Sequence, residues 1–353
     1  MKILYSILVM ALLVTAILPA VLATSVGTGI GIDITTEDFA PRVWMCDNRL
    51  VMDDAVQWGR ISPDGTLLVE RLENYAFEGE QIAWTVLVMD KNKIDQNIDD
   101  YATNGDSQGE GNDIEVNCQR IAQQPRVIPA SCNARILEEQ LTWNAETMAM
   151  FQCILTVETA DSMYGEYWIT VEAQDADGLM GTMDENEYWF LNPVIALSVD
   201  GDLVFEDVRP GTSSYSDTLL VGNDADDGSG VILDMFISGT DFYDSSSSGA
   251  RCEGTNSLLL KNFRYFATNG AYSSIQDTRA KDVENYVGIG YGDHWDRTMY
   301  GVNEIINTAG VFYSPGNILT PGAEVAITFK LNLPEPCNGD FDTGSLYFWG
   351  EAI

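Results

Sequence analysis

Acidic side chains gathered in short loops are the residues of this sequence best suited to chemistry. One cluster runs from Asp175 to Glu187, a second from Asn223 to Gly228, and a third from Asp106 to Asp113. Calcium prefers several oxygen ligands, and acidic loops supply them. Calcium is therefore the candidate cofactor, and its candidate ligands are Asp175, Asp177, Asp184, Glu187, Asp224 and Asp226.

The acidic loops also have a simpler interpretation. None of them has the spacing of an EF-hand loop. In Asp175–Gly178 the Asp and Gly are the residues that a hairpin turn needs for its backbone, whether or not a cation binds. The sequence alone leaves both interpretations open.

Catalysis by a Ser-His-Asp or Cys-His relay needs a histidine, and His294 is the only one in the chain. Asp293 and Asp296 flank it and could orient the imidazole ring. No G-x-S-x-G motif accompanies it. We therefore expect a loop histidine bonded to a neighbouring carboxylate in a protein that is not an enzyme. A secreted hydrolase with carboxylates converging near His294 is the less favoured alternative.

Six cysteines in a chain that carries an export signal predict disulfides. A zinc site is disfavoured, because no two cysteines lie within four residues of one another. Two cysteines fall after residue 192 and four before it. The expected pairs are Cys252–Cys337, Cys118–Cys132 and Cys46–Cys153.

The N-terminus has the pattern of a secretory signal peptide. Lys2 precedes the apolar run Ile3–Ala23, which ends in small residues before Thr24. We expect cleavage after Ala23 and a secreted, extracellular protein at the cell surface. The alternative is an uncleaved membrane anchor, because the run has about the 20 residues that span a bilayer.

A formal net charge of −36 excludes some classes of partner. Such a field repels nucleic acid and anionic lipid headgroups. We therefore expect no nucleic acid partner, and contact with a membrane only through an uncleaved leader. The acidity itself fits either solubility in a salty medium, where charges are screened, or a set of cation sites.

Apolar residues at every second position predict strands throughout the mature chain. Gln81–Asp90 is apolar on both faces, which is typical of a central strand. Met148–Pro193 holds two further strands joined by a turn, and Leu203–Val208 and Val325–Leu333 are other predicted strands. The pattern predicts an all-β fold with two Ig-like or jelly-roll-type β-sandwich domains. The expected boundaries are signal peptide 1–23, an N-terminal strand segment 24–40, domain 1 at 41–192 and domain 2 at 193–353.

The segment after the leader alternates apolar residues with glycine. Val26, Ile30, Ile32 and Ile34 are interleaved with Gly29, Gly31 and Asp33. This pattern predicts either a first edge strand of domain 1 or a donor strand that completes the sheet of a neighbouring subunit.

A tight Pro-Gly turn precedes two of the strongest predicted strands. Val208-Arg209-Pro210-Gly211 comes before the strand at Tyr215, and Leu319-Thr320-Pro321-Gly322 comes before the strand at Val325. In this respect the chain resembles the Ig-like β-sandwich modules of secreted microbial surface proteins, and archaeal surface-layer and fibre-forming proteins in particular. It lacks the Cys, Trp, Cys spacing of antibody domains. The resemblance implies a structural or interaction protein whose partners are copies of itself or other cell-envelope components.

Clustered aromatic residues support one alternative function. Tyr164, Tyr167, Trp168, Tyr188 and Trp189 lie close together in the sequence. Aromatic side chains in a sandwich usually belong to the core, but an exposed set could stack on sugars. A carbohydrate-binding adhesin is therefore the second hypothesis.

Overall fold

The computed structural model describes residues 32–353 except for a few internal stretches. Those stretches are 47–49, 53–67, 70–72, 93, 95–100, 108–113, 134–141, 176, 183–186 and 309–312. The predicted signal peptide lies outside the described residues. Phe39–Ile353 forms one compact unit, apart from Met1–Asp38. The predicted domain boundary at residue 192 falls inside that unit and stays a prediction.

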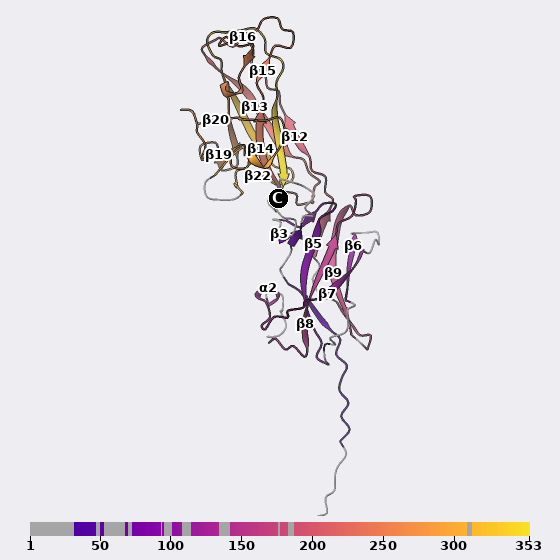
Figure 1. Cartoon of the computed structure of the whole chain (residues 1–353). Coiled ribbons are helices and arrows are strands. Elements are labelled where there is room, and N and C mark those ends of the chain that lie inside the picture. Colours follow the sequence, from indigo (N-terminus) through magenta and orange to yellow (C-terminus); the bar gives the residue numbers. More distant parts are fainter. Residues whose placement is uncertain are drawn as a thin grey trace, which may run out of the picture. The chain divides into compact units, whose positions relative to one another are not determined.

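Nearly all the regular structure is β-strand, which confirms the all-β fold (Figure 1). In the described ranges the helical elements are α2 (Ala130–Asn133) and two 3-10 helices, η1 (Leu260–Asn262) and η2 (Arg297–Met299). None of the helices in this part of the chain is long and apolar enough to cross a membrane.

The strands before residue 192, which we call the first sandwich, form one eleven-stranded sheet. Its order is β3-β2-β5-β8-β7-β6-β9-β11-β4, with β1 added to β5 and β10 added to β9. Among the described strands of this sheet, β4 and β11 are the one parallel pair. The strands are β1 (Arg42–Met45), β2 (Leu50–Met52), β3 (Leu68–Val69), β4 (Tyr75–Ala76), β5 (Gln81–Met89), β6 (Tyr101–Ser107), β7 (Ile114–Arg120), β8 (Met148–Thr156), β9 (Gly165–Gln174), β10 (Met180–Thr182) and β11 (Glu187–Leu191).

Strand β5 is central to the first sandwich, as its two apolar faces predict. Trp84, Val86 and Val88 pack into the larger core together with residues of β8, β9 and β11. Leu87 and Met89, on the other face, pack into a second core with Cys46 and residues of β8. The larger core contains residues from strands near both edges of the sheet, such as β2 and β11. The sheet therefore curves back over itself to enclose this core.

The two strands predicted in Met148–Pro193 both form, but they do not pair with each other. Strand β8 pairs with β5 and β7, whereas β9 pairs with β6, β10 and β11. The turn between them therefore carries the chain from one part of the sheet to another across the core.

The expected disulfide pairing of the first sandwich is wrong. Cys118 on β7 lies directly opposite Cys153 on β8, and these two are bonded. Cys46, just after β1, is bonded to Cys132 of helix α2. The predicted pairs Cys118–Cys132 and Cys46–Cys153 fail because strand neighbours depend on long-range pairing, which the alternation of residues does not encode.

The strands after residue 192, which we call the second sandwich, form two main sheets. The six-stranded sheet has the order β12-β13-β23-β18-β19 with β20 on β18, and the four-stranded sheet has the order β21-β14-β22 with β25 on β14. Strand pairs β15–β17 and β16–β24 are separate. The strands are β12 (Leu197–Asp200), β13 (Ser213–Asn223), β14 (Leu233–Gly239), β15 (Phe242–Tyr243), β16 (Arg251–Cys252), β17 (Ser257–Leu258), β18 (Phe263–Asn269), β19 (Tyr272–Ser273), β20 (Val287–Gly288), β21 (Gly290–Tyr291), β22 (Ile318–Leu319), β23 (Glu324–Asn332), β24 (Cys337–Asn338) and β25 (Leu346–Ala352).

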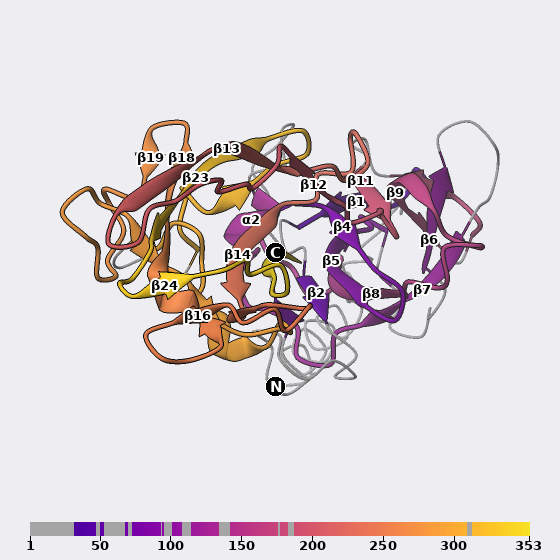
Figure 2. The ribbon, with the colours of Figure 1, turned by 90° about the horizontal axis from the view of Figure 1, so that it is seen from above.

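The two main sheets of the second sandwich enclose its core. Figure 2 shows β13, β23 and β18 side by side, with β14 across from them. Val221, Tyr265 and Ile327 of the six-stranded sheet pack against Leu233, Met235 and Ile237 of β14, in the four-stranded sheet. The bond Cys252–Cys337, the expected pair, joins β16 to β24 beyond the end of this core.

One predicted strand of the second sandwich does not form. Leu203–Val208 has no regular secondary structure and is not paired with any described strand. Asp207 has a positive φ of 50°, a left-handed conformation that interrupts a regular strand. The alternation is still visible in burial, because Leu203 and Phe205 are half-buried whereas Val204 is 57% exposed.

The disulfide Cys118–Cys153, between β7 and β8, should contribute strongly to stability. Replacing Cys118 and Cys153 together by Ser frees a loop whose ends are 35 residues apart in the sequence. The chain-entropy model predicts a loss of about 4 kcal/mol in the free energy of unfolding. Urea denaturation measures this loss, and non-reducing peptide mapping must show the other two disulfides intact. An unchanged denaturation midpoint would contradict the expectation.

Candidate functional site

The first acidic loop forms a turn around Asp175. One carboxylate oxygen of Asp175 accepts hydrogen bonds from the backbone N–H groups of Asp177 and Leu179, at 2.9 and 2.8 Å. Gly178 has a φ of 87°, which favours glycine. This geometry is that of an Asx turn, which connects β9 to β10.

The second acidic loop uses Asp226 as a connector. Its Oδ2 atom accepts hydrogen bonds from the Tyr164 hydroxyl and from the Val194 N–H, both at 2.9 Å. The hydrogen bond to Asp226 is the main reason that the pKa of Tyr164 is raised. The carboxylate therefore ties the loop after β13 to the turn before β9 and to the start of the second sandwich.

The remaining predicted cation ligands are not brought into one described cluster. Asp184 lies outside the described residues, and Asp224 is exposed. Glu187 begins β11. In the part of the chain that the structure describes, no three His, Cys, Asp or Glu side chains are placed to hold a metal ion. Calcium binding stays a prediction.

His294 is an exposed loop residue. Its Nδ1 atom lies 2.8 Å from a carboxylate oxygen of Asp293, and its Nε2 atom lies 3.7 Å from one of Asp296. The hydrogen bond to Asp293 raises the pKa of His294 and favours the imidazolium ion. Asp296 also caps η2 by accepting from the Thr298 N–H at 2.7 Å. This arrangement fits the expected loop histidine.

A buried carboxyl lies nearby on β14. Asp234 is 1% exposed, and its Oδ1 atom accepts a hydrogen bond from the Asn317 amide at 2.6 Å. Its Oδ2 atom has no hydrogen-bond partner. Burial, with the nearby carboxylates of Glu304 and Glu351, raises the pKa of Asp234 to about 8. Asp234 is therefore protonated at neutral pH, which removes the cost of a buried charge.

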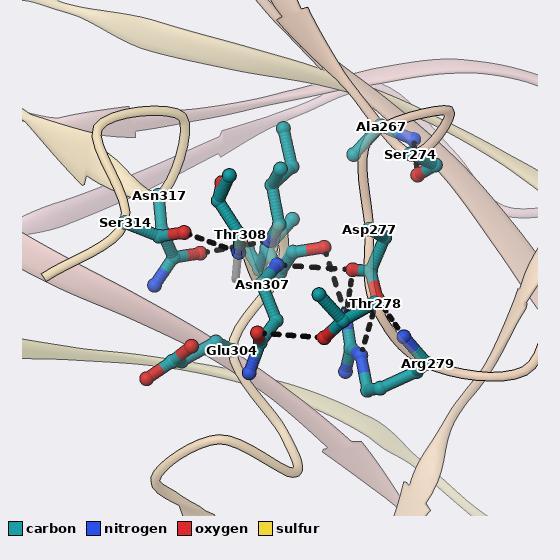
Figure 3. A network of polar contacts seen from close by, with 12 residues as sticks. Ala267, Ser274, Asp277, Thr278, Arg279, Glu304, Asn307, Thr308, Ser314 and Asn317 are labelled. Atoms are coloured by element: carbon teal, nitrogen blue, oxygen red, sulfur yellow. Dashed lines mark hydrogen bonds and ion pairs between the residues drawn. The ribbon is translucent and has the colours of Figure 1, made fainter. Parts of the chain in front are cut away.

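A second buried carboxyl is fully partnered (Figure 3). Asp277 accepts from the backbone and side chain of Arg279 and from the Asn307 N–H, all at 2.5 to 3.0 Å. Burial alone would raise the pKa of Asp277, but these hydrogen bonds hold it below its usual value. Arg279 also donates to the Tyr265 hydroxyl at 2.8 Å. The network ties two long loops to the core and has a structural role.

A groove at one end of the second sandwich, lined by apolar residues and by acidic ones, is one recessed surface of the described residues that could hold a partner. It has a volume of about 650 Å³. Phe263 of β18 and Leu331 of β23 line it from the six-stranded sheet, and Phe242 and Leu258 line it from β15 and β17. We call this pocket the apolar groove.

One wall of the apolar groove is the extended run that failed to become a strand. Leu203 and Phe205 line the groove from this run, and the Phe205 ring lies 5.9 Å from that of Phe263. Leu203–Val208 makes no backbone hydrogen bond with the described residues. An apolar floor therefore lies beside a strand-like backbone whose N–H and C=O groups are unpaired.

The other wall is held by the turn after Cys337. Gly339 has a φ of 95°, and a Cβ atom there would lie 2.6 Å from Ala250, so only glycine fits. Asp342 accepts from the N–H and hydroxyl of Ser245, and the hydroxyl is the main reason that its pKa is lowered. With the disulfide Cys252–Cys337, these contacts fix the wall. The residue pattern does not predict the groove, because its lining comes from segments far apart in the chain.

Comparisons with known proteins give only weak likenesses. No family model and no curated protein matches the chain. A solved structure named BspA_C_WT is 10% identical, with a TM-score of 0.31, and the match covers 86% of this chain and 96% of that one. A chaperone–tip adhesin complex of CFA/I fimbriae biogenesis is 8% identical, with a TM-score of 0.23, and covers 89% and 92%. These likenesses identify no family for this chain.

Asp226 should stabilise the fold more than its neighbour. Asp226→Ala removes the acceptor for the Tyr164 hydroxyl and the Val194 N–H. We expect a loss of about 1 to 2 kcal/mol in the free energy of unfolding, measured by urea denaturation. Asp227→Ala, on the exposed neighbour, is the matched control and should change little. Equal effects of the two changes would contradict this role.

Asp234 should make stability depend on pH. Because its pKa is raised from 3.8 to about 8, the folded state binds the extra proton between these values. The contribution of Asp234 is therefore fully present below pH 4 and is lost as pH rises through 8. Asp234→Asn should remove this loss, so the variant should gain in melting temperature over the wild type from pH 5 to pH 8.5. Asp202→Asn, at an exposed site, serves as control. A gain that does not vary with pH would contradict the expectation.

Proposed function

We propose that this chain is a non-enzymatic protein of the cell surface, exported to the extracellular side. It acts as a structural or interaction module, and its partners are copies of itself or other cell-envelope components. Its copies assemble through the N-terminal segment, residues 25–39. The proposal excludes nucleic acid as a partner, because of the charge of −36.

The disulfides support export. All six cysteines are bonded in three pairs, and such bonds persist in oxidising compartments outside the cytosol. The apolar run Ile3–Ala23 after Lys2 has the pattern of an export signal. Together these features favour a protein that folds and works outside the cytosol.

The observation that carries the proposal is the exposure of the N-terminal segment. Ile32 and Ile34 are 78% and 77% exposed, and the described residues Ile32–Ala40 form no strand. Large apolar side chains at every second position predict a strand, and here no neighbouring strand covers them. Exposed apolar surface of this kind marks a site of interaction with another protein.

One surface feature favours a second function, a carbohydrate-binding adhesin. Of the five clustered aromatic residues, Tyr167 and Trp189 are buried in the core. Trp168 and Tyr188 lie opposite each other on β9 and β11 with ring centroids 6.2 Å apart, and Tyr188 is 46% exposed. Such a pair can stack on a sugar ring. Glycan-array hits that disappear on replacing both residues by Ala would support this function, and no hits would oppose it.

Removing the N-terminal segment should abolish assembly. We expect the chain from Thr24 to Ile353 to form oligomers or fibres at high concentration, and a variant without residues 24–38 to stay monomeric. Light scattering after size-exclusion chromatography and negative-stain microscopy measure this, with and without calcium. Circular dichroism and intact disulfides control for folding. If the longer chain stays monomeric under all these conditions, the proposal fails.

A further inference from the structure

The apolar groove has the features of an acceptor for an added strand. We propose that it binds the N-terminal segment of a second copy of this chain, which pairs along Leu203–Glu206, the part of the run that precedes the left-handed residue Asp207. This inference rests on the proposed function and names the surface through which the copies join.

The groove offers an apolar surface and unpaired backbone groups, and a bound strand needs both. Phe205, Phe263 and Leu331 supply an apolar floor and wall. The unpaired backbone of Leu203–Val208 supplies the N–H and C=O groups for main-chain hydrogen bonds. In strand addition, main-chain bonds give affinity and pockets for alternate side chains give specificity.

The N-terminal segment has matching chemistry. In an extended conformation Val26, Thr28, Ile30, Ile32 and Ile34 fall on one face. The opposite face has Gly27, Gly29 and Gly31, so it presents little side chain to solvent or to a nearby backbone. No charged residue occurs from Thr24 to Ile32, so this part of the segment adds no carboxylate to the acidic rim of the groove, and Asp33 falls on the face opposite Ile32 and Ile34.

The rim of the groove argues against other occupants. Asp207, Asp340 and Asp342 line it beside the apolar residues. These carboxylates repel an acidic peptide or an anionic lipid headgroup. An uncharged, apolar strand avoids this repulsion, and residues 26–32 of this chain have the uncharged, alternating sequence that such a strand needs.

The position of Phe39 favours a second copy over the chain's own groove. Phe39 is anchored at the Met89 end of β5, where its N–H donates to the Asn92 side chain and its ring packs into the smaller core. The chain passes to the second sandwich at the other end of β5, where Leu191 lies opposite Ala76. At about 3.3 Å per residue, β5 is about 26 Å long, whereas the seven residues from Phe39 to Ile32 reach about 23 Å. Ile32 and Ile34 are therefore too close to Phe39 to reach the groove of their own chain.

Photo-crosslinking tests this inference directly. Ile32 is replaced by the photoreactive residue p-benzoylphenylalanine in the chain from Thr24 to Ile353, and equal amounts of ordinary and ¹⁵N-labelled protein are mixed. We expect cross-links between the two isotopic forms that map to residues 203–210 or 331–341. Cross-links found only within one copy would overturn the assignment to a second copy.

Paired variants test both sides of the contact. Ile34→Asp should lower the oligomeric fraction at least tenfold, and Thr35→Asp, on the opposite face, should leave it unchanged. In the groove wall, Phe205→Glu should have the same effect as Ile34→Asp, and the exposed neighbour Val204→Glu should not. Circular dichroism checks that the groove variants fold, and the segment variants test the contact without altering the groove.

The outcomes separate this inference from the proposed function. If oligomers form through the N-terminal segment but the cross-links map elsewhere, the groove assignment is wrong and the proposed function stands. If no oligomers form, both are wrong. If Thr35→Asp is as damaging as Ile34→Asp, the segment does not bind through one apolar face, and the strand model is overturned.

Discussion

Neighbouring strands or water must satisfy the hydrogen-bonding groups of an extended backbone. In this chain the pairing of strands determines two of the three disulfides and leaves the groove open. Where β7 lies beside β8, Cys118 meets Cys153 and the two can bond. Where Leu203–Val208 fails to pair, an apolar surface stays open beside an unpaired backbone. Strand pairing therefore gives the first sandwich its cross-strand disulfide, and the lack of pairing leaves an unpaired backbone beside the groove of the second sandwich.

The sequence predicts where strands form better than it predicts which strands pair with each other. Residue alternation identifies β5 and β23, because each buries at least one face and the pattern is local. It does not say which strands lie side by side, which is why two disulfides were assigned to the wrong partners.

Local conformation explains the failure at Leu203–Val208, where the alternation is correct but the left-handed backbone at Asp207 ends the strand. The groove was beyond sequence reasoning altogether. Its walls come from residues 203–210 and 331–342, more than 100 positions apart. The turn at Asp175, in contrast, is predictable from the sequence, because it depends only on the neighbouring Asp and Gly residues.

Basic residues are few in this chain, and some of them are paired with carboxylates. Arg279 is used to hold Asp277, and Lys330, 7% exposed, binds Asp282 and Glu284. These bonds stabilise the second sandwich, but they withdraw positive charge from the surface. The exposed surface is therefore more one-sidedly acidic than the composition alone suggests, which favours contacts between copies that depend on apolar and backbone groups and on screening by salt.

The bond Cys46–Cys132 has a mechanical consequence. It follows directly after β1, the first strand beyond Phe39. A pull on the N-terminal segment can peel only the four residues of β1 away from β5 before the load reaches Cys46. From there the force passes through a covalent bond to helix α2, so a copy held by its N-terminal segment resists unravelling from that end.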